Sequence, residues 1–172
     1  MQTGTATVFS SEHHKQLTAL ARKLNHATRS KSNEARQAAD KKLAEFAKRV
    51  GIVNATAEPL DADELLGRPS CSLAVYGSLR PGEQNFHQVE MIAGEWFSGT
   101  VEGELGAWRQ YKRLTIDGTV RNQVPVDILR SDQLPRHWNR LDEFEGPAYQ
   151  RVFWPVTIAN GLIVATLYVR PL

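Results

Sequence analysis

Cysteine is almost absent from this 172-residue sequence, in which Cys71 is the single example. One cysteine excludes an intramolecular disulfide and favours a reducing, cytoplasmic setting. Long apolar runs are also missing: the longest, residues 161–169, is far shorter than the ~20 residues that cross a membrane as a helix. The N-terminus lacks a basic start followed by an apolar run, so we expect neither a signal peptide nor a membrane partner.

A strong net charge is missing as well, since the formal charge is only +2. The charges are nevertheless unevenly distributed. Residues 12–49 hold ten Lys/Arg and four Asp/Glu, a local charge of +6, and the rest of the chain holds 11 basic and 15 acidic residues, a local charge of −4. The basic segment either meets a partner or docks on the acidic part. It carries no groove-reading motif, which argues against nucleic acid as that partner.

Several catalytic signatures are absent. Ser78 does not stand in a Gly-x-Ser-x-Gly elbow, and the loop around it lacks the Gly-Lys-Ser/Thr end of a phosphate-binding P-loop. Cys71 starts an expected strand, which favours a buried side chain over a nucleophile. The five histidines have no metal-ligand spacing to another histidine, a cysteine or an acid. The sequence therefore predicts no metal site.

Residues 11–50 are expected to be helical, as a helical hairpin or as one bent helix. The first half has one apolar face, formed by Leu17, Leu20, Ala21, Leu24 and Thr28. Ser32 can cap the second half, whose apolar stripe is Ala35, Ala39, Leu43, Phe46, Ala47 and Val50, and Gly51 follows as a stop residue. Because these stripes are narrow and rich in alanine, they need a surface to lie on. That surface is the rest of the chain, a second copy in a homodimer, or another protein bound through residues 11–50.

Residues 52–69 are interpreted as a connector that contains a capping box, Asp61 and Glu64. From residue 70 the apolar period changes from 3.6 to 2. Strands are expected at 72–76, 99–105, 123–129, 149–158 and 162–169, a helical turn at 83–92 and a helix at 132–144. Pro125 would place the third strand at an edge or a bulge. The pattern predicts a helical extension over 1–69 and an α+β domain over 70–172, a small mixed β-barrel with flanking helices.

Two short stretches are candidates for a functional site. Glu145 ends the expected helix just before Gly146, which makes it either a general base at a helix-to-strand junction or one more solvated acid beside Asp142 and Glu143. The loop from Tyr76 to Gly82 follows a strand. It is either an ordinary turn or a nest of backbone N–H groups that binds a carboxylate or phosphate.

Together these stretches resemble the gamma-glutamylcyclotransferase-like superfamily over residues 70–172. Tyr-Gly-Ser-Leu-Arg-Pro-Gly at 76–82 is similar to its opening loop, and Leu-Asp-Glu-Phe-Glu-Gly at 141–146, with a tyrosine and an arginine following, is similar to its second signature. The resemblance implies a small mixed β-barrel. It also implies a catalytic acid and a set of substrate-binding residues, which fall here on Glu145 and on Tyr76, Gly77, Ser78, Leu79, Arg80, Tyr149 and Tyr168.

The reaction implied by the resemblance is the release of 5-oxoproline from a small gamma-glutamyl amine or peptide by intramolecular aminolysis, without a cofactor. A glutamate at its usual pKa is a poor base at pH 7, so partial burial should raise the pKa of Glu145. A fold does not fix a function. The alternative is an inactive barrel that serves as a binding module and contacts a protein through the basic N-terminal helices.

Overall fold

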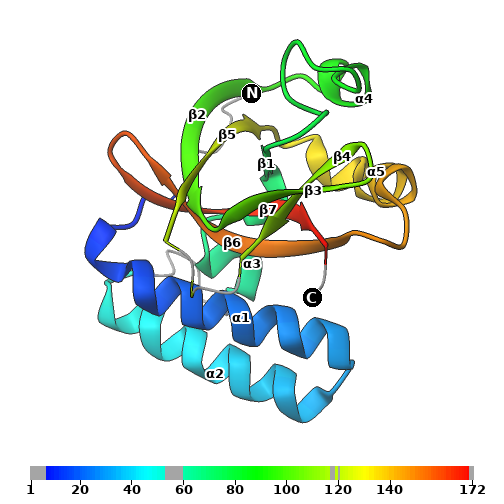
Figure 1. Cartoon of the computed structure of the whole chain (residues 1–172). Coiled ribbons are helices and arrows are strands. Elements are labelled where there is room, and N and C mark those ends of the chain that lie inside the picture. The colour runs from blue at the N-terminus through cyan, green and yellow to red at the C-terminus, as the bar shows by residue number, and fades with distance from the viewer. Residues whose placement is uncertain (1–6, 53–59, 117–118, 120, 171–172) are drawn as a thin grey trace.

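A computed structural model describes residues 7–52, 60–116, 119 and 121–170. Its centre is a closed five-stranded β-barrel with helices on the outside (Figure 1), which confirms the predicted fold class. In order around the barrel, the strands are β1 (Ser72–Val75), β5 (Gln123–Arg130), β2 (Glu95–Glu102), β6 (Gln150–Ile158) and β7 (Gly161–Val169). A separate two-stranded sheet consists of β3 (Glu104–Trp108) and β4 (Tyr111–Thr115).

The helices flank the barrel. They are α1 (His14–Ser30), α2 (Asn33–Arg49), α3 (Ala62–Leu65), α4 (His87–Glu90) and α5 (Trp138–Glu145), with 3-10 turns η1 (Ser11–His13), η2 (Pro69–Cys71) and η3 (Leu134–Arg136). Within the described residues, none of the helices has the length and apolarity needed to cross a membrane. The helix expected at 132–144 is thus η3 followed by α5, and the expected turn at 83–92 contains α4.

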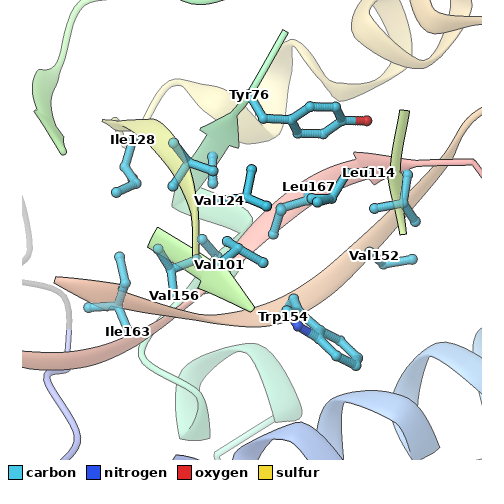
Figure 2. Close-up of a cluster of buried hydrophobic side chains, with 14 of the residues drawn as sticks. Tyr76, Val101, Leu114, Val124, Ile128, Val152, Trp154, Val156, Ile163 and Leu167 are labelled. Carbon is cyan, nitrogen blue, oxygen red and sulfur yellow. The ribbon is translucent and has the colours of Figure 1, made fainter. Parts of the chain in front are cut away.

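Strand β7 is buried on both faces, which explains its nearly continuous apolar sequence. Ile163 and Leu167 face the interior of the barrel, where Figure 2 shows them among side chains of the other strands. Leu162 and Val164 face outward and pack against the N-terminal helices. β7 pairs with β6 along its whole length, and the parallel contact of its Thr166 with β1 closes the barrel.

The N-terminal segment is a helical hairpin rather than one bent helix. Lys31 has a left-handed backbone (φ 52°), and the Ser32 hydroxyl accepts a hydrogen bond from the N–H of Ala35 at 3.1 Å, so the chain turns and a new helix begins. The predicted apolar faces are largely confirmed, although Ala35 and Val50 are only half-buried and one position of α1 differs. Ala27 is buried in place of Thr28, which is exposed and donates its hydroxyl to the carbonyl of Leu24.

Helix α1 lies between α2 and the barrel (Figure 1). Its Asn25 binds the backbone of Phe153 in β6 in both directions, donating at 2.9 Å and accepting at 3.0 Å, as a neighbouring strand would. Leucines of α1 and Phe46 of α2 share a buried cluster with Leu162 and Val164 of β7. All ten Lys/Arg of residues 12–49 are exposed. Apolar packing, the two hydrogen bonds of Asn25 and the contact of the Arg22 guanidinium with the ring of Trp154 therefore hold the hairpin on the barrel.

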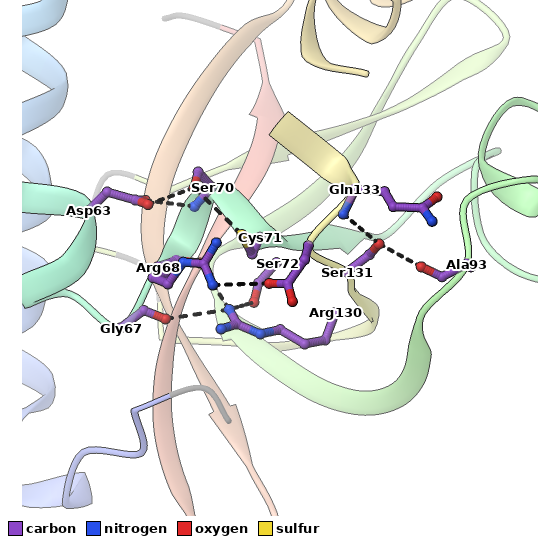
Figure 3. Close-up of polar contacts among 11 residues, drawn as sticks. Asp63, Gly67, Arg68, Ser70, Cys71, Ser72, Ala93, Arg130, Ser131 and Gln133 are labelled. Carbon is purple, nitrogen blue, oxygen red and sulfur yellow. Dashed lines mark hydrogen bonds and ion pairs between the residues drawn. The ribbon is translucent and has the colours of Figure 1, made fainter. Parts of the chain in front are cut away.

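The second part of the connector is fixed by polar contacts; residues 53–59 lie outside the described part of the chain. The predicted capping box is confirmed, with the N–H of Glu64 donating to Asp61 at 2.9 Å and the reciprocal bond at 3.1 Å. Arg130 of β5 is 5% exposed and donates to the carbonyl of Arg68 and to the hydroxyl of Ser72, both at 2.9 Å (Figure 3). These bonds attach the connector to β1 and β5.

Two strand predictions were wrong. β5 is neither an edge strand nor bulged at Pro125, because it pairs with β1 on one side and, in unbroken register, with β2 on the other. Pro125 is tolerated because the pairing with β1 stops at Asp127, so that Pro125 faces β2 alone and is exposed. The strand expected at 99–105 is two strands, β2 and β3, which are separated at Gly103. A side chain at Gly103 would lie 2.6 Å from the carbonyl oxygen of Thr115.

Leu17→Ala tests whether the hairpin is part of the barrel's cooperative unit. Leu17 is fully buried, so we expect a loss of about 2–5 kcal/mol in the free energy of unfolding. Urea unfolding should show one transition, at the same midpoint by far-ultraviolet circular dichroism and by tryptophan fluorescence. Lys15→Ala, an exposed change on the same helix, should shift stability by less than about 0.5 kcal/mol. Two separate transitions would contradict a shared core.

Candidate functional site

Glu145 is the last residue of α5 and lies half-buried in a cavity. Gly146 follows with a left-handed backbone (φ 75°), which turns the chain sharply toward β6. Burial raises the pKa of Glu145 from 4.5 to about 7. Desolvation explains the direction, because a carboxylate withdrawn from water is less stable than the neutral acid. At neutral pH this group can therefore both accept and return a proton.

The neighbouring acids have other surroundings. Glu143 is exposed to solvent. Asp142 accepts a hydrogen bond from the Tyr168 hydroxyl at 2.5 Å. It also forms an ion pair with Arg151, whose Nε lies 3.2 Å from a carboxylate oxygen of Asp142. Of the three acids, only Glu145 lines the cavity.

The loop after β1 is built from two successive turns. The N–H of Arg80 donates to the carbonyl of Gly77 at 3.1 Å, and the N–H of Glu83 donates to that of Arg80 at 2.9 Å. Gly82, at φ 84° after Pro81, supplies the left-handed residue that the second turn requires. The sequence Arg-Pro-Gly thus folds the loop back on itself.

Asn85 holds the front of this loop in place. Its backbone N–H donates to the carbonyl of Ser78 and its side-chain amide to the hydroxyl of Ser78, both at 2.9 Å. In the described part of the chain, no hydrogen bond uses the backbone N–H groups of Gly77, Ser78 and Leu79. Consecutive unpaired N–H groups of this kind are suited to bind an anionic oxygen.

The loop and Glu145 line the same cavity, which has a volume of about 620 Å³. Of the predicted site residues, the structure brings together Glu145, Tyr76, Gly77, Ser78, Leu79, Tyr149 and Tyr168. Arg80 is the exception, because it does not line the cavity. Its Nε lies 2.7 Å from a carboxylate oxygen of Asp127 in β5, so the guanidinium is held on the barrel wall.

Four tyrosines line the cavity with Glu145: Tyr76, Tyr111, Tyr149 and Tyr168. The Tyr76 hydroxyl donates to the backbone carbonyl of Tyr168 at 2.7 Å, and the Tyr149 hydroxyl donates to that of Lys112 at 3.2 Å. Burial raises the pKa of Tyr76 and of Tyr168, so both phenols stay neutral at physiological pH. The polar ends of these rings are engaged by the protein, which fixes the shape of the cavity.

Sequence reasoning missed one wall of the cavity, the β3–β4 hairpin. It contributes Trp108, Gln110, Tyr111 and Lys112. Its turn has no glycine, and the left-handed position is occupied by Arg109 (φ 55°), so the usual hairpin signal is absent. Residues of β3 are mostly exposed and only Leu114 of β4 is buried, so the alternating pattern that would have revealed the hairpin is absent.

Comparison with solved structures identifies the fold. The chain is similar to YkqA from Bacillus subtilis (24% identity, TM-score 0.50), over 58% of this chain and 35% of YkqA. It thus spans about a third of that protein. An AIG2-like protein from Mus musculus is also similar (20% identity, TM-score 0.47), over 58% of this chain and 76% of the mouse chain. A comparison with curated proteins finds no match.

The sequence profile of one family matches residues 73–172, which is more than half of the chain. That family is described as gamma-glutamyl cyclotransferase, AIG2-like. The chain belongs to this family, and the resemblance noted from the two sequence motifs is confirmed. The match begins at β1, so the N-terminal hairpin and the connector lie outside it.

Glu145→Gln should change how stability depends on pH. Because the pKa of Glu145 in the folded chain, about 7, is above the ordinary 4.5, the wild type has its full stability below about pH 4.5 and loses part of it as the pH rises through 7. Glutamine does not ionise. We expect the free energy of unfolding of the variant to increase relative to that of the wild type as the pH rises, by up to about 3 kcal/mol near pH 8.

Urea unfolding near pH 4.5, 6 and 8 measures this difference. Glu143→Gln, which changes an exposed acid two residues away, should leave the pH dependence unchanged. If the free energy of unfolding changes with pH in the same way for Glu145→Gln and the wild type, the carboxyl group of Glu145 is as exposed to water in the folded chain as in the unfolded chain, which would contradict the prediction.

Proposed function

We propose that this chain is an enzyme of the gamma-glutamyl cyclotransferase type that releases 5-oxoproline from a gamma-glutamyl amine or peptide, with Glu145 as the general base. The observation that carries the proposal is the position of Glu145. It is a desolvated carboxyl group with a pKa of about 7, in one cavity with three backbone N–H groups that have no hydrogen-bond partner among the described residues. Membership of the family supports a cyclotransferase-type activity.

The proposed reaction begins with a proton transfer. An α-ammonium group titrates near ~8, so most of the substrate arrives protonated and cannot attack. The carboxylate of Glu145 takes this proton. The freed nitrogen then attacks the γ-carbonyl carbon of the same molecule, and the carbonyl oxygen becomes an oxyanion. Collapse of this intermediate breaks the γ-amide bond, and the leaving nitrogen takes the proton back from Glu145. The attacking nitrogen still carries a second proton that the lactam does not keep, and this proton passes through Glu145 to the released amine. The products are 5-oxoproline and the amine as an ammonium ion, and Glu145 is again ionised.

The loop after β1 supplies the electrostatic part of the proposal. The N–H groups of Gly77, Ser78 and Leu79 are suited to hold the substrate α-carboxylate or the oxyanion. Tyr149 and Tyr168 contribute walls that keep the substrate folded. Ring closure is intramolecular, and well-oriented reactions of this kind reach effective molarities of ~10⁵ to 10⁸ M. Arg80 is left out of the proposed set of substrate contacts because Asp127 holds its guanidinium.

Glu145→Gln should lower kcat by about 10²- to 10⁴-fold, because the amide cannot accept a proton. The measurement is 5-oxoproline release from a panel of gamma-glutamyl amines and peptides. Glu143→Gln is the matched control and should keep wild-type turnover. Unchanged turnover in Glu145→Gln would overturn the role of this residue. Stabilisation of the wild type by 5-oxoproline without turnover of any panel member would favour a binding module instead.

The pH dependence of kcat/KM gives an independent test. For the wild type, kcat/KM should follow a narrow bell-shaped curve against pH. It should rise near pH 7 as Glu145 ionises. It should fall near ~8 as the substrate ammonium loses its proton, because Glu145 then has no proton to return to the leaving amine. A substrate N-methylated at the α-amine, with a different amine pKa, should move the falling limb only. A rising limb that stays near the pKa of an exposed carboxyl group would exclude Glu145 as the titrating base.

A further inference from the structure

A second cavity lies between α1 and one end of the barrel, and its volume is about 460 Å³. It shares no lining residue with the cavity of Glu145. Its walls come from α1, the end of β4, β6 and the end of β7. The described residues that line it are Arg22, Asn25, His26, Arg29, Thr115, Ile116, Gln150, Val152, Trp154, Val169 and Arg170.

Helix α1 contributes one continuous face to this cavity. Arg22, His26 and Arg29 are spaced by four and three residues, which places them on the same side of the helix. Asn25 lies within this set and is bound to the backbone of Phe153 through both its amide oxygen and its amide nitrogen. These two bonds fix the rotation of α1 about its axis. The basic side chains of this face therefore line the cavity while remaining exposed to solvent.

The lining is strongly cationic. Three arginines and a histidine meet there, and none of the described lining residues is an aspartate or a glutamate. Among the described residues, the ion pairs found include none for Arg22, Arg29 or Arg170. Guanidinium groups stay charged in proteins, so they raise a positive potential in a partly enclosed space.

Two of these arginines lie on aromatic rings instead of acids. The guanidinium of Arg22 is 5.9 Å from the ring centre of Trp154, and that of Arg170 is 3.7 Å from the ring centre of Trp108. The Nη1 atom of Arg170 is buried and has no hydrogen-bond partner among the described residues. A buried donor without an acceptor is unfavourable. Arg170 therefore keeps donor capacity that the described residues do not use.

We propose that this second cavity binds a small organic polyanion, either a phosphate ester or a polycarboxylate. The planar fork of arginine matches the oxygens of both groups. Gln150 and Thr115 add neutral hydrogen-bonding groups, and Val152 and Val169 can contact a short carbon skeleton. This site is independent of the reaction proposed for Glu145. The family match begins at residue 73, so the α1 half of the site belongs to the part of the chain outside it.

Isothermal titration calorimetry on the full chain tests the proposal, with citrate as the polycarboxylate and fructose 1,6-bisphosphate as the phosphate ester. Potassium chloride at matched ionic strength controls for screening. We expect saturable binding of at least one of the two, and the stronger of them identifies the anion class. Absence of saturable binding for both would overturn the proposal.

Matched variants locate the binding. Arg22→Gln with Arg29→Gln removes two charges from the cavity, and affinity should fall at least tenfold. Lys15→Gln with Lys23→Gln removes the same charge from exposed positions of α1 outside the cavity, and affinity should change less than twofold. If both variants lost the same amount of affinity, the anion would be attracted by the overall positive charge of α1 and not by this cavity, and the proposed site would be wrong.

Two further variants complete the test. Arg170→Lys keeps the charge but loses the fork, and it should weaken binding as well; unchanged affinity would exclude Arg170 from the site. Glu145→Gln should bind the anion as the wild type does, because Glu145 lines only the first cavity. Loss of binding in that variant would place the anion in the first cavity and contradict a second site.

Discussion

The burial of β7 on both faces is the constraint on which the rest of the molecule depends. Inward side chains such as Leu167 fill the barrel, while Leu162 and Val164 hold the N-terminal hairpin through apolar contact. Tyr168 then reaches the cavity of Glu145, and Val169 reaches the second cavity. One strand thus joins the barrel, the extension and both cavities. A strand without a solvent face can do this because every side chain has a packing partner.

The two cavities differ in their electrostatics in a way that follows from what surrounds each charge. In the first, which Glu83 and Lys112 also line, the carboxyl group of Glu145 shares the cavity with neutral phenols, and its withdrawal from water raises the pKa of Glu145. In the second, several guanidinium groups gather without an acid among the described lining residues. The cavities come close at one contact, where Arg170 of the second lies over Trp108 of the first.

The fold could be predicted largely from local pattern. The β6–β7 hairpin, the capping box at Asp61 and the α2 cap at Ser32 depend on neighbouring residues, so the sequence reveals them. Pairing between distant segments could not be read in this way. Pro125 indicated an edge strand or a bulge, yet β5 lies inside the barrel, between β1 and β2; the proline is tolerated there because β1 ends before it reaches that position. The β3–β4 hairpin lacked a local signal, since its turn has no glycine and the residues of β3 are mostly exposed.

The sequence by itself determined the two ordered motifs, and with them the family resemblance and the acid at position 145, but it left the loop from Tyr76 to Gly82 open between an ordinary turn and a nest of N–H groups. The tertiary structure alone decided which members of those motifs meet. In the folded chain Glu145 is partly removed from water and lines the same cavity as Gly77 and Ser78, whereas Arg80 lies outside that cavity and forms an ion pair with Asp127. Desolvation and ion pairing depend on residues distant in the chain. A motif therefore shows which groups are present, and only packing shows where their charges lie.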